Sequence, residues 1–392
     1  SGGMIAQKYG RGDGKRSMMK RILTATAVAL FLSVGGVAQA QETLSSPGAG
    51  YEIVPVAEGL DHPWSLTFMP DGSMLIIELT GQIRILREGV VSPDPVAGVP
   101  EVYFESQGGL FDVLLDPDFA ENGTVYLSYA HGTPDENGTR VARAHFDGAA
   151  LSEIDVIFDA QPTKDTPVHY GGRMVFLPDD TLLVTVGDGF DYREEAQKLD
   201  ADLGKIIRIN RDGSVPEDNP FVGREDVRPE IWSYGHRNMQ GILYDEASGR
   251  VYEHEHGARG GDEINIIEPG KNYGWPVITW GVDYSGARIS PYTEYEGMEQ
   301  PVLYWTPSIA PSGFTLYRGT AFPQWDGDLF VGALAAQHVR RVDMEDGKPV
   351  GQEELFGELG KRIRDVRTGP DGYLYLVTDG EDGSVLRVEP GE

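Results

Sequence analysis

A histidine and an aspartate that could act together in proton transfer stand at two junctions near the middle of the chain. His169 lies in residues 168–173 (VHYGGR) and Asp188 in residues 185–189 (TVGDG), each beside a strand-like segment. A neutral imidazole can accept a proton near neutral pH, and a neighbouring carboxylate fixes its tautomer and stabilises the imidazolium. The pattern therefore predicts a general base, His169, oriented by Asp188. A structural pair is the alternative, and these two residues alone do not exclude it.

Two further clusters carry side chains that could hold a ligand. Gln107 precedes two glycines, which would let the backbone approach a ligand closely. Arg237 and Asn238 lie in residues 234–238 (YGHRN), and Arg237 could bind a carboxylate through two parallel hydrogen bonds. The structural alternatives are a tight turn for the first cluster and an internal ion pair for the second.

Residues 254–265 (HEHGARGGDEIN) contain histidines and acidic residues but do not predict a zinc site. The H-E-x-x-H spacing is absent, and the glycines oppose the helix that such a site needs. A glycine-rich loop can instead turn backbone carbonyls inward, and these oxygens suit a hard cation such as Ca²⁺. Asp262 and Glu263 would then brace the loop without contacting the metal.

Arg362 and Arg364 alternate along a strand-like segment, and alternation places both side chains on one face. Two adjacent guanidinium groups repel each other unless an anion or an acidic neighbour offsets their charge. At a solvated edge this repulsion is small. If the pair faces a channel, it calls for a polyanionic ligand.

The elements that must position these residues follow a sixfold repeat, in which a turn rich in Pro, Asp and Gly precedes a β-rich run. Several runs are followed by a second strand with alternating apolar and basic residues, as at 82–86, 205–209, 339–342 and 384–388. The spacing of roughly 45 to 80 residues fits a propeller blade better than a solenoid rung. The six runs begin at Met74, Thr124, Thr181, Arg250, Asp328 and Tyr373.

We therefore predict an all-β fold, a six-bladed β-propeller of four-stranded antiparallel blades. A β-sandwich or two stacked barrels is the alternative, because short strands and glycine-rich turns occur in those folds too. Helical periodicity is scarce, and the best candidate for a short helix is residues 193–203. Ligands of a propeller usually meet the loops at one mouth of the central channel, where the polar clusters are expected to lie.

Composition narrows the classes of partner. The chain of 392 residues has 33 Lys and Arg against 62 Asp and Glu, a formal charge of -29, which disfavours nucleic acid and anionic membranes. It has no cysteine, which excludes disulfides, thiolate nucleophiles and iron–sulfur clusters bound through cysteine. Its chemistry must use oxygen, nitrogen or a bound cofactor.

The first 40 residues have the pattern of a targeting segment. Residues 1–3 (SGG) resemble a cloning remnant, and basic residues precede an apolar run, 22–37, that ends in residues 38–40 (AQA). This is the pattern of a secretory signal peptide with its cleavage site, and the run is shorter than the ~20 apolar residues that span a bilayer. We predict a signal peptide within residues 1–40, one catalytic propeller over 41–392, a periplasmic or secreted location and no stable membrane insertion.

Taken in order, the clusters resemble those of the PQQ-dependent soluble aldose sugar dehydrogenases, the family that includes soluble glucose dehydrogenase. The resemblance runs from about Gly59 to Val388. It implies a six-bladed propeller that binds pyrroloquinoline quinone (PQQ) and Ca²⁺ and oxidises aldose sugars at C1 to lactones. Its most specific parts are residues 235–238 (GHRN) with 240–241 (QG), 262–265 (DEIN), 272–276 (NYGWP), 310–313 (APSG) and 362–365 (RIRD).

The resemblance also implies a role for each cluster. His169 would take the proton of the anomeric hydroxyl while hydride passes from C1 to the quinone, and Asp188 would orient His169. Arg237 and Ca²⁺ would stabilise the oxyanion that develops on the quinone. Arg362 and Arg364 would pair with cofactor carboxylates. The other expected contacts are Gln107, Arg237 and Asn238 to PQQ, and the carbonyl oxygens of Gly257 and Ala258 to Ca²⁺.

Three departures from the family pattern place the chain nearer the broad-specificity aldose branch than the glucose enzyme. Ala258 stands where relatives often have proline, a cofactor-binding lysine of soluble glucose dehydrogenase falls near Ala335, and Val168 replaces an acidic residue. The preferred sugar and the external electron acceptor stay unidentified. Two other functions remain open: a calcium-dependent lactonase-type propeller hydrolase, with carboxylates and amides converging on an axial metal, and a non-catalytic binding propeller of the cell envelope.

Overall fold

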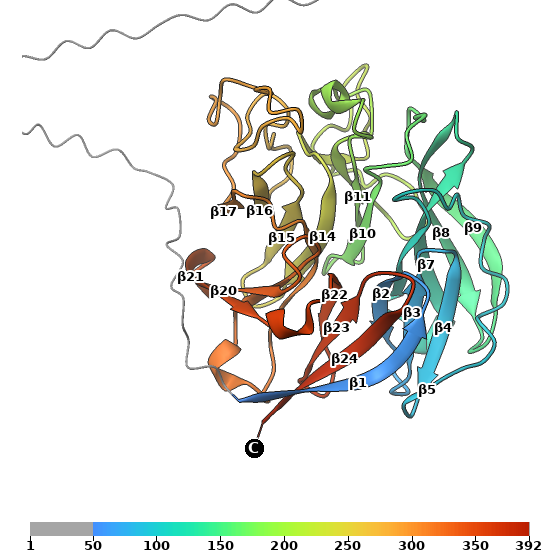
Figure 1. The fold of residues 1–392 in the computed structure, drawn as a ribbon. Coiled ribbons are helices and arrows are strands. Elements are labelled where there is room, and N and C mark those ends of the chain that lie inside the picture. Colours follow the sequence, from blue (N-terminus) through green and yellow to red (C-terminus); the bar gives the residue numbers. More distant parts are fainter. Residues whose placement is uncertain (1–49, 392) are drawn as a thin grey trace, which may run out of the picture. The chain divides into compact units, whose positions relative to one another are not determined.

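The computed structural model describes residues 50–391, so the expected signal peptide within residues 1–40 lies outside the described residues. The described residues form six antiparallel sheets of four strands each (Figure 1). The six-bladed propeller predicted from the repeat is therefore confirmed, and the sandwich and stacked-barrel alternatives are wrong.

Each blade is named here by its strands from the inside outward. The first blade contains β2 (Pro63–Phe68), β3 (Met74–Glu78), β4 (Gln82–Arg87) and β5 (Val90–Val91). The second contains β6 (Leu110–Leu115), β7 (Thr124–Gly132), β8 (Asn137–Phe146) and β9 (Leu151–Asp159). The third contains β10 (Gly171–Phe176), β11 (Leu182–Val186), β12 (Lys205–Ile209) and β13 (Ile231–Tyr234).

The fourth blade contains β14 (Met239–Asp245), β15 (Arg250–Glu255), β16 (Asp262–Ile267) and β17 (Leu303–Trp305). The fifth contains β18 (Pro311–Leu316), β19 (Leu329–Ala333), β20 (Val339–Glu345) and β21 (Lys348–Leu355). The sixth contains β22 (Ile363–Thr368), β23 (Leu374–Thr378), β24 (Gly383–Pro390) and β1 (Tyr51–Leu60).

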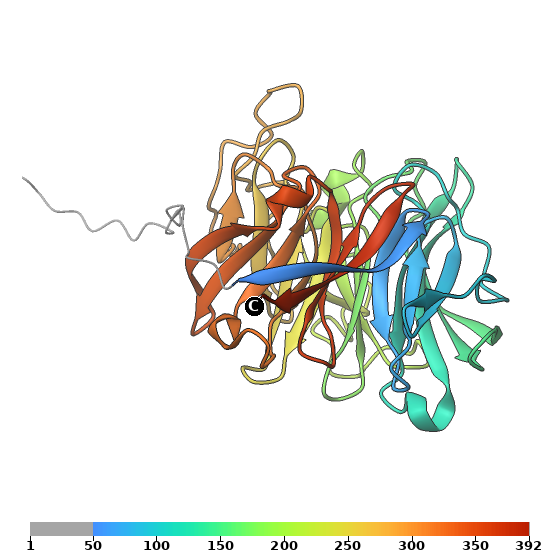
Figure 2. The same ribbon diagram turned by 60° about the horizontal axis from the view of Figure 1, so that its bottom comes forward.

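The ring closes through the two ends of the described chain. The innermost strands β2, β6, β10, β14, β18 and β22 contact one another in that order, and β22 also contacts β2. β1 pairs antiparallel with β24, from Tyr51 opposite Pro390 to Leu60 opposite Gly383. Figure 2 shows the blue β1 beside the dark red β24. The first and last segments therefore share one blade, which ties the ring shut.

The sequence repeat corresponds to the middle of each blade. The six β-rich runs form the second strands (β3, β7, β11, β15, β19 and β23), and the alternating apolar and basic segments form the third strands β4, β12, β20 and β24. In the turn before β3, Asp71 Oδ1 accepts the Ser73 N–H at 2.9 Å, and Asp179 does the same for Thr181 at 3.1 Å. Such Asx turns explain the recurring aspartate, because they reverse the chain between the first and second strands.

Helices are short, and the expected helix at residues 193–203 is mostly absent. The 3₁₀ helix covers only Arg193–Gln197, and Lys198 is already extended, with ψ 139°. The next residues form backbone hydrogen bonds elsewhere, because Leu199 accepts the Arg228 N–H and Asp202 donates to Gln161. The other helices are α1 (Phe119–Asn122) and the 3₁₀ turns Pro323–Trp325 and Gly357–Leu359. No helix within residues 50–391 combines the length and apolar character needed to cross a bilayer.

Candidate active site

The polar clusters meet at one mouth of the propeller because of where they stand on the strands. Gln107, His169 and Asn238 lie shortly before innermost strands, whereas Asp188 and Gly257 lie just after second strands. In an antiparallel pair, the start of one strand and the end of the next share an edge of the sheet. The fold therefore brings segments from several blades together above the channel.

His169 and Asp188 form a buried hydrogen-bonded pair. His169 Nδ1 lies 2.7 Å from Asp188 Oδ1, and the two residues are 5% and 0% exposed. Asp188 Oδ1 also accepts the Phe190 N–H at 2.9 Å, and Oδ2 accepts Trp275 Nε1–H at 2.8 Å. With the carboxylate held by these donors, His169 Nδ1 carries the proton and Nε2 is left as an acceptor.

The charge states of this pair suit proton abstraction. Burial lowers the pKa of His169 and outweighs the opposing charge of Asp188, so the imidazole is neutral at pH 7. Burial acts to raise the pKa of Asp188, but the charge of His169, their hydrogen bond and the charge of Arg237 together hold it below its ordinary value. A neutral imidazole beside a carboxylate is the resting state of a general base.

The backbone around His169 is tightly constrained. His169 has a left-handed conformation, with φ 55°, and its N–H donates to Gln107 Oε1 at 2.9 Å. A Cβ at Gly187 would lie 2.2 Å from the His169 carbonyl oxygen, so only glycine lets the two junctions approach so closely. A non-glycine residue in this conformation is strained, and such strain is concentrated at functional sites.

Arg237 contacts the glycine-rich loop after β15. Its Nη1 donates to the carbonyl oxygens of His256 at 3.1 Å and Gly257 at 2.5 Å, and its guanidinium lies 5.2 Å from the centre of the Trp275 ring. Asp262 braces this loop, since its Oδ1 accepts the Gly257 N–H at 2.9 Å. Its Oδ2 accepts the N–H groups of Ile309 and Ala310 and the hydroxyl of Ser308.

Arg362 and Arg364 share one carboxylate, Asp379, which the sequence interpretation missed. Arg362 Nε lies 2.8 Å from Oδ2, and Arg364 Nε and Nη2 each lie 3.1 Å from Oδ1. Burial acts to raise the pKa of Asp379, but the two arginines hold it below its ordinary value. One anion offsets two cations, so the protein itself relieves part of the repulsion and a net positive charge remains. An aspartate directly after the neighbouring strand β23 was the available signal.

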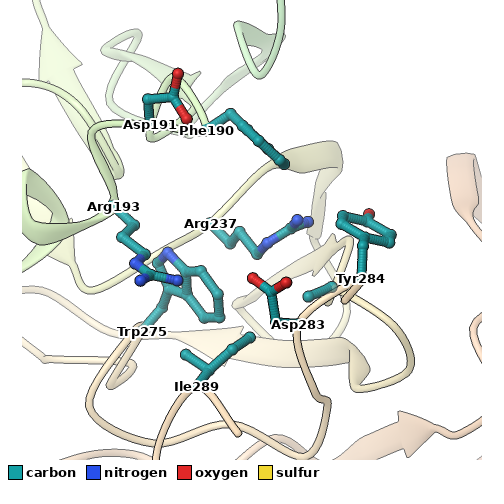
Figure 3. Close-up of a pocket in the computed structure, with 9 residues that line it drawn as sticks. Phe190, Asp191, Arg193, Arg237, Trp275, Asp283, Tyr284 and Ile289 are labelled. Carbon is teal, nitrogen blue, oxygen red and sulfur yellow. The ribbon is translucent and has the colours of Figure 1, made fainter. Parts of the chain in front are cut away.

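Two hollows adjoin these residues. A central cavity of ≈320 Å³ is lined from all six blades, including Gln107, Asn238, Arg362 and Arg364. A side pocket of ≈230 Å³ is lined by Arg237 and Ala258 together with residues to which the sequence analysis gave no role in the site (Figure 3). These additional residues are Phe190, Asp191, Arg193, Trp275, Asp283, Tyr284 and Ile289.

The residues fit a bound PQQ and, with one rearrangement, Ca²⁺. PQQ is a tricarboxylate, and the central cavity combines the excess positive charge of Arg362 and Arg364 with the amides of Gln107 and Asn238. The Gly257 carbonyl suits a hard cation but already accepts a hydrogen bond from Arg237. A cation at this oxygen therefore has to replace the guanidinium of Arg237.

The channel below the cavity argues against the axial metal of a lactonase-type hydrolase. Arg173 lies over the ring of Trp64 at 3.9 Å, its Nε donates to the Gln240 carbonyl, and its Nη1 lies 3.4 Å from Asp365 Oδ2. These contacts link the third blade to the first, fourth and sixth, so a buried cation already stands between innermost strands of four blades. Within residues 50–391, the His/Asp/Glu group close enough to hold a metal ion, His236, Glu253 and Glu255, lies instead around the second strand β15.

Comparisons with known proteins agree with this architecture. The glucose/sorbosone dehydrogenase family model matches residues 60–387. The aldose sugar dehydrogenase YliI of Escherichia coli is 44% identical over 87% of this chain and 94% of its own length. The apo structure of the E. coli soluble aldose sugar dehydrogenase has a TM-score of 0.84, at 41% identity over 87% of this chain and 100% of its own. A PQQ-bound aldose sugar dehydrogenase from Streptomyces coelicolor has a TM-score of 0.70, at 28% identity over 88% and 100% of the two chains.

Proposed function

Because the chain belongs to the glucose/sorbosone dehydrogenase family, we propose that it is a PQQ-dependent aldose sugar dehydrogenase that uses Ca²⁺ and releases a lactone. The observation that carries the proposal is the buried hydrogen-bonded pair of His169 and Asp188, next to Gln107, which lines the same cavity as two arginines. The aldose sugar dehydrogenase of E. coli and the PQQ-bound structure from S. coelicolor support it.

The chain's own residues account for the proton transfer. His169 Nε2 accepts the proton of the anomeric hydroxyl, and Asp188 stabilises the imidazolium that results. Loss of this proton drives electrons from oxygen toward C1, so that the C1 hydride leaves and the C1–O bond becomes the carbonyl of the lactone. When bound, PQQ supplies the two-electron hydride acceptor and Ca²⁺ the electrophilic assistance to it.

Binding of the cofactor falls to the central cavity. Arg362 and Arg364 pair with its carboxylates, and Gln107 and Asn238 donate hydrogen bonds from the second and fourth blades. Gly257 and Ala258 offer carbonyl oxygens to Ca²⁺, after Arg237 has released the Gly257 oxygen. Arg237 is then free to donate to developing negative charge within the site.

We also propose that the enzyme works in the periplasm or outside the cell and passes its electrons to an external acceptor. The secretory pattern before Gln41 supports export, and the reduced cofactor must be reoxidised before each new turnover. Expression of the full chain in a Gram-negative host, followed by fractionation and N-terminal sequencing, tests export. A protein that stays unprocessed in the cytoplasm contradicts it.

Aldose-dependent reduction of an artificial dye by the purified protein, with PQQ and Ca²⁺ added, tests the activity. His169→Ala should lower turnover by a factor of about 1,000 or more while PQQ still binds, as judged by absorbance. If PQQ binds but none of the aldoses tested supports dye reduction, the protein is not an aldose dehydrogenase. A non-catalytic binding propeller predicts that His169→Ala changes nothing measurable.

A further inference from the structure

Lys164 is a buried lysine near the proposed catalytic pair, His169 and Asp188, and the proposed mechanism does not use it. It stands shortly before His169 in the chain and is only 2% exposed. Burial of a lysine is costly because its ammonium gives up hydration, and lysines are rarely buried unless other groups compensate their charge. The partners of Lys164 therefore show what holds it in the fold.

The Lys164 ammonium meets three acceptors. Its Nζ donates to the carbonyl oxygen of Thr166 and to Asn137 Oδ1 at 3.0 Å, and it lies 3.5 Å from the centre of the Tyr170 ring. An ammonium has three N–H donors for these three partners, and the face of an aromatic ring attracts a cation. A neutral amine would turn its lone pair toward an acceptor. The contacts thus fit the charged form of Lys164.

Lys164 is tied to the segment that carries His169. The backbone N–H of Lys164 donates to the Asn137 carbonyl oxygen at 2.9 Å, and the Asn137 N–H donates to the Lys164 carbonyl oxygen at 2.8 Å. Asn137 Oδ1 also accepts the hydroxyl of Tyr170 at 2.7 Å. Since Tyr170 directly follows His169, the lysine and its asparagine hold the ring beside the base from below the mouth of the propeller.

Lys164 is also tied to the segment that follows Asp188. Thr166, which accepts from Nζ, donates its hydroxyl to the carbonyl oxygen of Gly189 at 2.6 Å. The Gly189 N–H donates to the His169 carbonyl oxygen at 3.3 Å. A Cβ at Gly189 would lie 2.7 Å from Lys164 Cδ, so the stem of the lysine packs directly against this backbone. One buried network therefore links both members of the catalytic pair to Lys164.

We propose that Lys164 is a positioning residue of the catalytic pair, which fixes the backbone around His169 and Asp188 and opposes protonation of the resting imidazole through its charge. This inference rests on the proposed dehydrogenase function and adds a residue that acts through the base without touching the substrate. A like charge near an imidazole disfavours the imidazolium, whereas the carboxylate of Asp188 favours it. The buried cation offsets part of that attraction.

The charged and titratable groups around His169 come from several segments. Burial lowers the pKa of His169, and the charge of Asp188 opposes this lowering. The charges of Arg237 and Lys164 add to the lowering. His256 contributes no charge at neutral pH, because burial lowers its pKa to about 3. Two cations thus oppose one carboxylate at the imidazole, and Lys164 is the cation that is also joined to its backbone.

The charge of Lys164 is present in the range where His169 titrates. Burial lowers the pKa of Lys164 to about 7, and the charges of Asp188 and Asp165 oppose this lowering. Tyr170 stays neutral there, because burial raises its pKa. Lys164 is an ammonium below about pH 7, and the pKa of His169 lies below its ordinary value of 6.5. Removal of the ammonium should therefore raise the pKa of His169.

The test measures the pKa of His169 by NMR of the holoenzyme labelled with ¹³C in its histidine rings, together with the pH profile of kcat/KM for aldose-dependent dye reduction. The chain has eight histidines, and His169→Gln assigns the signal. Lys164→Met should raise both the pKa of His169 and the midpoint of the profile by about half a pH unit. At pH 8, kcat should fall by about tenfold because the pair is held less firmly, with PQQ affinity within about twofold of the wild type.

Lys205→Met is the matched control for the loss of a buried lysine. Lys205 is fully buried at the start of β12, and its Nζ donates to the carbonyl oxygens of Glu195 and Leu203. The largest charge that acts on it is that of Asp202. This variant should leave the pKa of His169 within about 0.2 pH unit of the wild type.

Thr166→Val separates position from charge. It removes the hydroxyl that donates to Gly189 but keeps the Lys164 ammonium. We expect kcat to fall by about threefold or more, with the pKa of His169 unchanged. If Thr166→Val shifts this pKa as much as Lys164→Met does, the shift comes from packing and not from charge, and the inference fails.

The outcomes separate this inference from the proposed function. If Lys164→Met moves the pKa of His169 by less than about 0.2 pH unit, Lys164 is merely structural, even if kcat falls, and the dehydrogenase still stands. If the pKa shifts as expected but the wild type oxidises no aldose, the effect of Lys164 on the imidazole stands and the dehydrogenase fails. If Lys164→Met does not fold, Lys164→Gln, which keeps a donor for the Thr166 carbonyl, is measured in its place against the same limits.

Discussion

The substitution Asp188→Asn removes one charge from the proposed catalytic pair and leaves its volume almost unchanged. Asp188 accepts hydrogen bonds at both oxygens, from His169 and Phe190 at Oδ1 and from Trp275 at Oδ2. Asparagine has one acceptor and one donor, so it cannot satisfy both sides. If its oxygen faces His169, its amide opposes the indole N–H of Trp275. If its amide faces His169, the imidazole must carry its proton on Nε2, where it cannot act as a base.

The size of the effect follows from the geometry of the pair. At the observed Nδ1–Oδ1 distance of 2.7 Å and an effective dielectric constant of about 20, the attraction between an imidazolium and a carboxylate is about 6 kcal/mol. The transition state gains part of this, because His169 becomes charged only as the proton moves. We therefore expect kcat to fall by a factor of about 1,000 to 10,000, which corresponds to about 4 to 5.5 kcal/mol.

Steady-state dye reduction against aldose concentration measures the loss, and the PQQ titration shows whether the cavity is intact. The expected result is a large fall in kcat with PQQ affinity within about twofold of the wild type. If Asp188→Asn binds PQQ normally and keeps more than about one tenth of the wild-type kcat, Asp188 neither fixes the tautomer nor stabilises the imidazolium, and the proposed pair is wrong.

Three further predictions concern pH, charge and stability. Because burial lowers the pKa of His169, kcat/KM should rise with pH through a midpoint below the ordinary value of 6.5 and stay level around pH 7; a midpoint above 6.5 would contradict the neutral resting state. In PQQ titrations, Arg364→Gln should weaken binding by about tenfold, whereas Asp379→Asn should strengthen it by freeing two guanidinium groups; shifts in the same direction would refute the charge argument. Burial lowers the pKa of Lys205 to about 7 from 10.5, so the unfolded chain binds the extra proton between these values and stability rises with pH there. The Tm of the wild type should therefore rise relative to the Tm of Lys205→Met from pH 7.5 to pH 9.5. If the Tm of the wild type minus that of the variant stays constant, Lys205 is charged in the fold.

The number of blades could be predicted from the sequence because each blade repeats a local signal. An aspartate that closes an Asx turn and a β-rich run that is buried between blades occur in a short window, as at Asp71 before β3. The pairing of β1 with β24 had no such signal, since it joins segments more than 300 residues apart and neither segment specifies the other. This pairing can be inferred only from the general rule that closure of a propeller ring protects the strand edge at which the ring would otherwise stay open.

The same distinction applies to the candidate site. His169, Asn238 and Arg364 stand out in the sequence because polar residues and glycines gather at strand ends, and the antiparallel topology then brings them together. Asp379 was missed, and Trp275 was quoted only as part of a motif, because their importance lies in which side chains they meet. For Arg362 and Arg364, the sequence analysis required an anion or an acidic neighbour to offset their charge but could not identify that neighbour, which is Asp379.

The fold separates the parts of the site that must stay fixed from those that can vary. Arg173, on the third blade, contacts three other blades, so the floor of the central cavity is held by four of the six innermost strands. His169 and Asp188 lie two residues beyond the paired ends of β10 and β11 in a single blade, where Gly171 pairs with Val186. Phe190, Asp283 and Tyr284 lie on connections outside the strands, so substitutions at these positions leave the hydrogen bonds between strands intact. Residues on these connections can therefore change without loss of the base or of the cavity, and a propeller of this design is expected to diverge in its loops before it diverges in chemistry.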